Sequence, residues 1–88
     1  MSLRKRCQSE CSYEFVTPEA ALMLVACAMA LETVTGVWPS VEIQCRRVRL
    51  RLAVSEGAAG AVERRVWREL VAWARKLGGE LVAAGSAT

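Results

Sequence analysis

Apolar and polar residues alternate in several short stretches of the chain, and this alternation predicts β-strands with one buried face. In residues 12–16, two aromatic residues alternate with serine and glutamate. A turn at residues 8–10 is expected to join this strand to another extended segment at residues 3–8. A β-hairpin is therefore predicted near the start of the chain.

Two further strands are predicted at residues 41–45 and 48–54, where valine, isoleucine and leucine alternate with polar residues. The parity of the apolar positions changes between Cys45 and Val48. A two-residue turn at residues 46–47 explains the change, because it places Cys45 and Val48 on the same side of the sheet. These strands are expected to form a second hairpin.

Between the hairpins, a helix is predicted from Pro18 to Thr35. Thr17 is a favourable N-cap, proline fits the first helical position, and Gly36 suits the C-terminal cap. Residues 20–31 are apolar all round the helix. Such a helix is expected to be covered on two sides, by its own sheet and by another subunit. The alternative is an alanine-rich helix with an exposed apolar exterior.

A second helix is predicted at residues 61–77, and two glycines end it. Its expected buried stripe consists of Val62, Val66, Leu70, Trp73 and Leu77. Residues 80–88 are small and mixed, so a flexible tail is expected there. The predicted fold class is α+β in the order ββαββα. Residues 1–79 form one domain, whose two helices pack on one face of a four-stranded antiparallel sheet.

Composition narrows the class of protein. The chain has 88 residues, of which 53% are hydrophobic and 24% charged, with a net charge of +3 and no histidine. The longest apolar run is too short for a membrane span. The basic residues at the start are followed by polar residues and not by the apolar run of a signal peptide. A soluble cytoplasmic domain without membrane contact is therefore expected. The mild positive charge, without aromatic residues among the arginines, does not indicate nucleic acid. A monomer of this size would be marginally stable, so oligomerisation is expected.

No catalytic constellation and no metal site is predicted. The composition excludes histidine chemistry, and no glycine-rich phosphate loop follows a strand. The spacings of the four cysteines, at positions 7, 11, 27 and 45, match no common zinc site. Cys7 and Cys11 could face each other across the first hairpin and oxidise, although a cytosolic chain would keep them reduced.

Two features indicate a binding surface. Arg47, Arg49 and Arg51 alternate with apolar residues, so they should line the open face of the sheet. Guanidinium groups there could bind an acidic segment of a partner, or they could keep the sheet soluble. Trp38, in the loop after the first helix, is either a lid on the core or an exposed contact residue.

Residues 13–77 resemble the pterin-4a-carbinolamine dehydratase family. The family has two aromatic residues in a strand, a helix, a His-His-Pro loop, a strand valine, a third histidine, and a Glu-Arg-Asp run before the final helix. The matching positions are Tyr13, Phe15, Pro39, Val48, Ser55, Glu63, Arg64 and Arg65. From the proline to the third histidine position, the spacing matches without a gap. The resemblance implies the same α+β fold.

The histidines of that family are replaced in this chain. Val37 and Trp38 stand at the paired histidine positions, Ser55 at the third, and Arg65 where the family has an acid. These side chains cannot supply the acid and base that expel the hydroxyl of a pterin carbinolamine. The resemblance therefore implies a degenerate active site, with no cofactor and no enzyme activity.

A histidine-poor branch of the family, encoded with form I Rubisco and alpha-carboxysome components, often has Gly-aromatic-aromatic-Pro in this loop. Residues 36–39 are similar, except at the first aromatic position. This implies a Rubisco assembly chaperone in the cytoplasm or the carboxysome. It would be a homodimer or tetramer that binds the Rubisco large subunit through Trp38 and the three arginines. The alternatives are a dimerisation adaptor for another protein, and a residual pterin enzyme that uses Ser55, Cys45 or Glu56.

Overall fold

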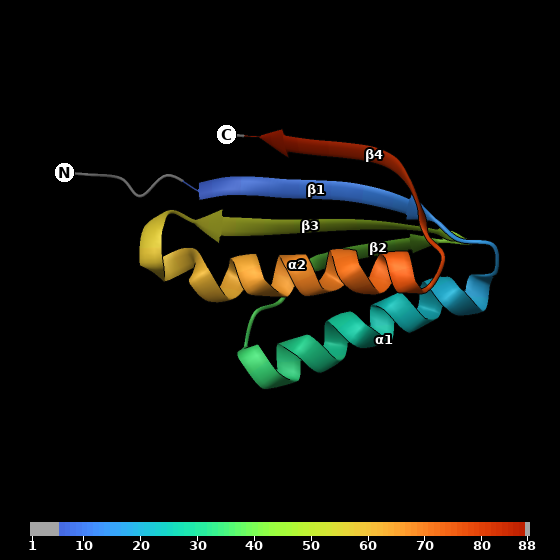
Figure 1. The fold of residues 1–88 in the computed structure, drawn as a ribbon, viewed down its shortest axis with the longest axis horizontal. Coiled ribbons are helices and arrows are strands. Elements are labelled where there is room, and N and C mark those ends of the chain that lie inside the picture. Colours follow the sequence, from blue (N-terminus) through green and yellow to red (C-terminus); the bar gives the residue numbers. More distant parts are fainter. Residues whose placement is uncertain (1–5, 88) are drawn as a thin grey trace.

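The computed structural model describes residues 6–87 as a layer of helices packed on a layer of strands (Figure 1). Side chains are described from residue 8 to residue 84. The elements are β1 (Arg6–Glu14), α1 (Pro18–Thr35), β2 (Ser40–Gln44), β3 (Arg47–Ser55), a 3-10 turn (Gly57–Gly60), α2 (Ala61–Lys76) and β4 (Glu80–Ala87).

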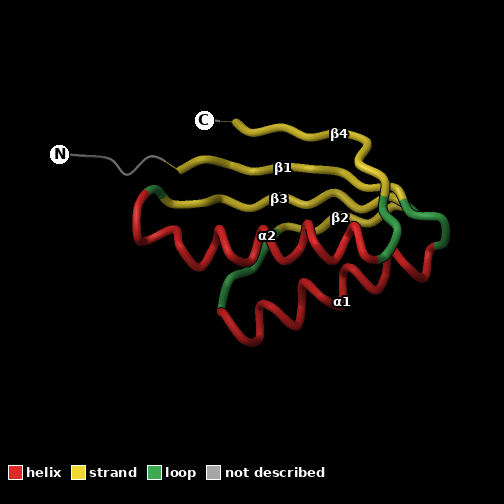
Figure 2. The backbone as a smooth tube through the Cα atoms, in the orientation of Figure 1, coloured by secondary structure: helices red, strands yellow, loops and turns green. Residues whose placement is uncertain are grey.

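The sheet has the strand order β2-β3-β1-β4, and neighbouring strands are antiparallel throughout. Figure 2 shows both helices together on one side of the strands. Helix α1 connects β1 to β2, which lie on either side of β3, and α2 connects β3 to β4, which lie on either side of β1. This is the ferredoxin-like arrangement. The predicted α+β class, with two helices on one face of a four-stranded antiparallel sheet, is confirmed.

The order of elements is β-α-β-β-α-β and differs from the predicted ββαββα order at both ends of the chain. Each residue from Arg6 to Glu14 pairs with β3 without a break, so these residues form one strand. The turn expected at residues 8–10 is therefore wrong. Its polar residues suit a strand, because alternate side chains face the open side of the sheet. Residues 3–5 of the expected first strand lie outside the described residues.

The segment predicted to be a flexible tail, residues 80–88, forms β4 at Glu80–Ala87. This strand pairs with β1 at the edge of the sheet, with a shift in register at Ser12 and Tyr13. Its small residues carry little alternation of polarity, so the strand is specified by the open edge of β1 rather than by its own pattern. The sheet thus extends past the domain end predicted at residue 79.

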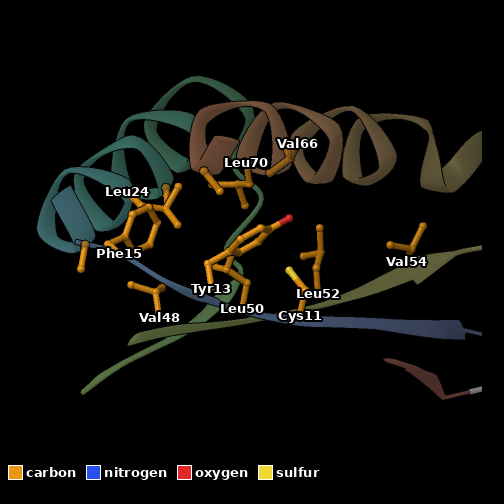
Figure 3. Packing of buried hydrophobic residues seen from close by; sticks show 13 residues of the cluster. Cys11, Tyr13, Phe15, Leu24, Val48, Leu50, Leu52, Val54, Val66 and Leu70 are labelled. Carbon is orange, nitrogen blue, oxygen red and sulfur yellow. The ribbon is translucent and has the colours of Figure 1, made fainter. Parts of the chain in front are cut away.

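The core lies between the helices and the inward face of the sheet. Figure 3 shows it running from Phe15 and Leu24 at one end to Val54 at the other. The buried apolar residues are Cys11, Tyr13, Phe15, Ala21, Leu24, Ala28, Val48, Leu50, Leu52, Val54, Val66, Leu70 and Ala74. Most of the sheet's contribution comes from β1 and β3, the two central strands.

The buried stripe of α2 differs from the predicted one. Helix α2 buries Val66, Leu70 and Ala74, whereas Val62 and Trp73 are 49% and 42% exposed. The inward positions repeat every four residues and end in a small alanine, which is a narrower stripe than the predicted one. The Trp73 ring lies outside the core, where the ammonium group of Lys76 is 5.2 Å from its centroid.

The predicted bounds of α1 are confirmed, together with both caps. The hydroxyl of Thr17 accepts a hydrogen bond from the Ala20 amide at 3.2 Å. Gly36 adopts the left-handed conformation at φ 74° and donates to the Glu32 carbonyl at 2.7 Å. The N-cap satisfies a backbone amide at the start of α1, and the left-handed Gly36 turns the chain out of the helix at its end.

The turn between β2 and β3 lies one residue earlier than predicted. It consists of Cys45 and Arg46, and Gln44 pairs with Arg47 across it. Cys45 has a φ of 59° and so takes the left-handed conformation. The register places Ile43, rather than Cys45, opposite Val48.

Candidate functional site

The open face of the sheet carries the three predicted arginines. Arg47, Arg49 and Arg51 alternate along β3 with the buried residues Val48 and Leu50. Because successive side chains of a strand point to opposite faces, the arginines lie on the face that the helices leave uncovered. The structure thus places these three residues together, where the sequence predicted them.

Glutamates from the two flanking strands pair with these arginines. Arg47 lies 3.2 Å from Oε1 of Glu14, and Nε of Arg49 donates to Oε1 of Glu10 at 2.6 Å. Arg49 also lies 3.7 Å from Glu42 on β2. Three carboxylates therefore oppose three guanidinium groups, and the arginine face is an ion-pair network whose charges balance.

The pKa of Glu10 reflects this pairing. The hydrogen bond from Arg49 lowers the pKa of Glu10, and the charges of Arg49 and Arg51 act in the same direction, against a raising effect of burial. Nε of Arg51 lies 3.5 Å from the same carboxylate oxygen without forming a hydrogen bond. An acidic partner would have to displace these glutamates in order to bind the arginines.

The glutamates of this network were not predicted as part of the site. Glu10 and Glu14 share the parity of a single strand, which is a signal that the sequence contains. The expected turn at residues 8–10 hid that parity, because it placed Glu10 outside any strand. Pairing between β1 and β3 brings these glutamates next to the arginines, which lie about 40 residues further along the chain.

Trp38 lines an apolar groove between α1 and β2. Figure 1 shows that α1 is inclined to the strands, so that its C-terminal end lies away from the sheet. The groove has a volume of about 350 Å³ and is lined by Val25, Ala28, Met29, Trp38, Pro39, Val41 and Ile43. Pro39 is buried, whereas Trp38 is 65% exposed. Trp38 is therefore exposed and is not a lid on the core, while its role as a contact residue stays a prediction.

The outward side of α1, beside this groove, is apolar. The helix buries only Ala21, Leu24 and Ala28. Facing away from them are Leu22, Met23, Ala26, Met29, Ala30 and Val34, here named the α1 exterior. Leu22, Met23 and Met29 are each 56% exposed, and Val34 is 83% exposed. Met29 also lines the groove, so the groove and the α1 exterior form one continuous apolar surface.

Within the described part of the chain, α1 is also the one helix long and apolar enough to cross a membrane. That finding rests on length and composition alone, and a core helix of a soluble protein passes the same test. Helix α1 contributes three residues to the core. The finding is therefore weak evidence for a membrane span.

The four positions of the degenerate active site do not line one cavity. Val37 packs against the core, and Trp38 lines the groove beside β2. Ser55, at the end of β3, lines a separate hollow of about 550 Å³ near the start of α2. Arg65 lies on the outside of α2, where its side chain is 71% exposed and 4.0 Å from Glu69. The two hollows share no lining residue.

Polar groups around the second hollow hold the backbone at the start of α2. The amide of Ser55 donates to Oε1 of Glu63 at 2.9 Å. Arg64 donates to the carbonyl oxygens of Ser55 at 3.3 Å and Gly57 at 2.8 Å. These contacts give Glu63 and Arg64 a structural role, because they join the first turn of α2 to the end of β3 and to the 3-10 turn.

The three cysteines whose side chains the structure describes, Cys11, Cys27 and Cys45, are free thiols. Cys7 and Cys11 lie four residues apart in the single strand β1. Their Cα atoms are therefore separated by about 13 Å, too far for the disulfide between them that the sequence left open. Burial raises the pKa of the Cys11 thiol to about 11 and also raises that of Cys27. Within the residues that the structure describes, no group of three or more histidine, cysteine, aspartate or glutamate side chains could hold a metal ion.

Comparisons with known proteins support the fold and no function. No protein-family model matches this sequence, and neither does any curated protein. A solved structure described as "De novo designed protein Ferredog-Diesel" is similar over 100% of this chain and 89% of the other, with a TM-score of 0.57 and 18% identical residues. At that identity the likeness extends to the fold alone. The chain is therefore similar in architecture to a designed protein.

Proposed function

We propose that this chain is a non-catalytic protein-binding domain that assembles as a homodimer through the α1 exterior. The observation that carries the proposal is the apolar character of α1 from Leu22 to Ala30, on the side turned away from the sheet as well as on the side turned toward it. An exposed apolar surface of this kind marks an interaction site. A lipid surface fits less well, because α1 contains no lysine or arginine to attract anionic headgroups.

A second copy fits the α1 exterior by symmetry. In an antiparallel crossing of two α1 helices about Ala26, Leu22 of one copy lies opposite Ala30 of the other, and Glu19 lies opposite Thr33. Alanine at the crossing point permits the approach of about 8–10 Å that packed helices adopt. No two like charges meet in this arrangement, whereas a parallel pair would bring the two copies of Glu19 together.

Two matched substitutions test the dimer. Ala26→Glu places a carboxylate at the proposed crossing point, and Ala72→Glu makes the same change on the exposed side of α2, between Arg68 and Lys76. Analytical ultracentrifugation at micromolar concentration should show a dimer or tetramer for wild type and for Ala72→Glu. It should show a folded monomer for Ala26→Glu. A monomeric wild type refutes the dimer.

The absence of catalysis is proposed from the chemistry of the candidate positions. Val37, Trp38 and Arg65 supply no acid–base pair, and they lie apart from Ser55. The raised pKa values of Cys11 and Cys27 keep both thiols protonated at neutral pH, which disfavours nucleophilic attack. A pterin titration monitored by absorbance should show neither turnover nor saturable binding. Turnover would restore the residual pterin enzyme among the alternatives.

The partner proposed from the sequence resemblance is the Rubisco large subunit. Support comes from the similar loop at residues 36–39 and from the lost histidines. Trp38 offers an apolar contact surface that is 65% exposed. Arg47, Arg49 and Arg51, by contrast, are already engaged by glutamates. We therefore assign the larger share of partner binding to Trp38.

Co-expression with form I Rubisco subunits tests this partner. The amount of soluble assembled enzyme should rise with wild type and fall back with Trp38→Ala. Trp73→Ala is the matched control, because Trp73 is also an exposed tryptophan but lies on α2. No rise in assembled enzyme, together with no association with the large subunit, would favour an adaptor for a different protein.

A further inference from the structure

Strand β2 forms one edge of the sheet and pairs on one side only, with β3. In a hairpin with a two-residue turn, the closing pair exchanges both backbone hydrogen bonds, and bonded and non-bonded pairs alternate from there. Gln44 and Arg47 are the closing pair. Val41 and Ile43 are therefore non-bonded positions, whose N–H and C=O groups point away from β3. Outside the ladders, the backbone hydrogen bonds of the described residues reach neither of them.

The side chains of the same two residues line the apolar groove beneath α1. An extended segment that pairs with β2 would bond to their outward N–H and C=O groups. Its alternate side chains would then point toward the groove. Ile43 is 43% exposed and Trp38 is 65% exposed, so both present apolar area that such side chains would cover. Unpaired backbone groups and an apolar groove thus lie side by side along one strand.

Charge determines which segment fits. Glu42 lies between Val41 and Ile43, on the open face of the sheet, and its side chain is 67% exposed. The cation nearest to it in the network, Arg49, is 3.7 Å away. A residue opposite Glu42 on an added strand would lie on the same face, about 5 Å away between Cβ atoms, where an opposite charge stabilises and a like charge destabilises.

A second copy of β2 does not meet this requirement. Antiparallel pairing of two β2 strands along their full length places Glu42 opposite Glu42. The other edge strand, β4, cannot place a basic residue opposite Glu42 either, because Glu80–Ala87 contains no lysine or arginine. A basic residue between two apolar ones does occur on the inner side of β2. There β3 has Val48, Arg49 and Leu50 opposite Ile43, Glu42 and Val41.

We propose that β2 binds an extended segment of another protein by strand addition, and that this segment reads apolar–basic–apolar. The basic residue lies opposite Glu42, and the two apolar side chains lie against the groove formed with Trp38 and Met29. The proposal depends on the proposed protein-binding role, but it does not depend on dimerisation through α1.

Two fluorescein-labelled peptides test the charge requirement. One is Ser-Thr-Val-Arg-Leu-Thr-Ser, blocked at both ends, and the other has Glu in place of Arg. By fluorescence anisotropy, the Arg peptide should bind about tenfold more tightly at low salt, and this preference should shrink to about twofold at 1 M salt. Glu42→Gln should bring the two peptides within about twofold at low salt as well. Equal affinities for wild type at low salt overturn the proposal.

Two variants of Ile43 test the backbone pairing. Ile43→Pro removes the outward N–H and leaves the β2–β3 ladder intact, because proline is tolerated on an edge strand where its nitrogen faces solvent. Ile43→Ala shortens the side chain and keeps the N–H. The Arg peptide should bind Ile43→Pro at least about tenfold more weakly than Ile43→Ala, with circular dichroism confirming that both are folded. Equal binding to both variants overturns strand addition.

Ultracentrifugation of the same samples separates this proposal from the proposed function. If wild type dimerises but binds neither peptide, strand addition is overturned and the proposed dimer stands. If the Arg peptide dissociates the dimer, the peptide and the second copy compete for one surface, which overturns the independence of strand addition from dimerisation. Binding of the Arg peptide to a dimer that stays intact supports both proposals.

Discussion

Arg49 donates a hydrogen bond from Nε to Oε1 of Glu10 at 2.6 Å, although the residue directly opposite Glu10 in the β1–β3 register is Arg51. The contact is therefore a diagonal one, and it leaves Arg49 within 3.7 Å of Glu42 on the other neighbouring strand. One guanidinium group thus connects β1, β3 and β2 across the open face. Loss of this side chain should affect the sheet itself before it affects any partner.

Arg49→Met should lower the free energy of unfolding by a small amount at neutral pH. It should also reduce the further decrease in this free energy as the pH falls. Pairing with Arg49 lowers the pKa of Glu10 from its ordinary value of 4.5. A lowered pKa contributes stability above the unfolded-state value, and this contribution disappears as the pH falls through the folded-state value. Urea unfolding between pH 7 and pH 3 should therefore show a smaller decrease for the variant than for wild type. Arg65→Met on α2 is the control, and parallel curves for Arg49→Met and wild type would contradict the prediction.

Gly60→Ala should destabilise the domain by roughly 2–4 kcal/mol. A Cβ atom at Gly60 would lie 1.7 Å from the carbonyl oxygen of Ser55, so the end of β3 and the start of α2 would have to move apart. The φ of Gly60 is −93°, so the cost is one of space and not of backbone conformation. Gly78→Ala is the contrasting control, because its Cβ meets nothing within 4 Å but its φ is +81°. That variant should lose only about 1–2 kcal/mol, and equal losses in thermal unfolding would refute the steric explanation.

Cys45→Gly should stabilise the hairpin between β2 and β3 by about 1 kcal/mol. Cys45 is the one residue other than glycine with a positive φ among the described residues, at 59°. Glycine adopts this conformation without the steric cost that a Cβ atom brings. The midpoint of urea unfolding should rise for Cys45→Gly and stay unchanged for Cys45→Ala. A rise for both variants would assign the effect to loss of the thiol.

Cys11 should react with iodoacetamide at pH 8 at least about tenfold more slowly than Cys45. Cys11 is 5% exposed, and burial raises its pKa to about 11, whereas Cys45 is exposed in the turn. Mass spectrometry of the labelled peptides measures both rates in one sample. Similar rates would place Cys11 outside the core.

The same pKa predicts a loss of stability in alkali. The unfolded thiol loses its proton near pH 9, while the folded one retains it up to about pH 11, so the free energy of unfolding should fall across this range. Cys11→Ala should remove this part of the pH dependence, with Cys45→Ala as the control. A pH dependence that persists in Cys11→Ala would show that other groups cause it.

The resemblance on which the function was predicted is limited by topology. It covers residues 13–77 only, whereas the sheet of the structure also includes β4 at Glu80–Ala87, outside the matched region. Of the positions matched to the family's histidines, Val37 packs against the core, and Trp38 and Ser55 line two separate hollows. The Rubisco partner therefore stays a prediction, whereas the binding surfaces are argued from the contacts of this chain.

The candidate site was predicted in part. The alternation along β3 predicted the open-face position of Arg49, because side-chain direction in a strand follows from sequence spacing alone. The neutralising glutamates were missed, because they belong to strands that only the sheet order makes neighbours. The groove was missed for a similar reason: the incline of α1 relative to β2 follows from helix–sheet packing, which no local pattern contains.

The sequence by itself determined both helices and the second hairpin, because caps, amphipathic spacing and alternation act over a few residues. Thr17 and Gly36 mark the two ends of α1 in the sequence, and they cap the helix in the structure. Only the tertiary structure decided that residues 6–14 are one strand and that residues 80–87 join it. Strand pairing depends on which distant edge offers unpaired backbone groups and a shared buried face, and this property belongs to the assembled sheet rather than to any segment of it.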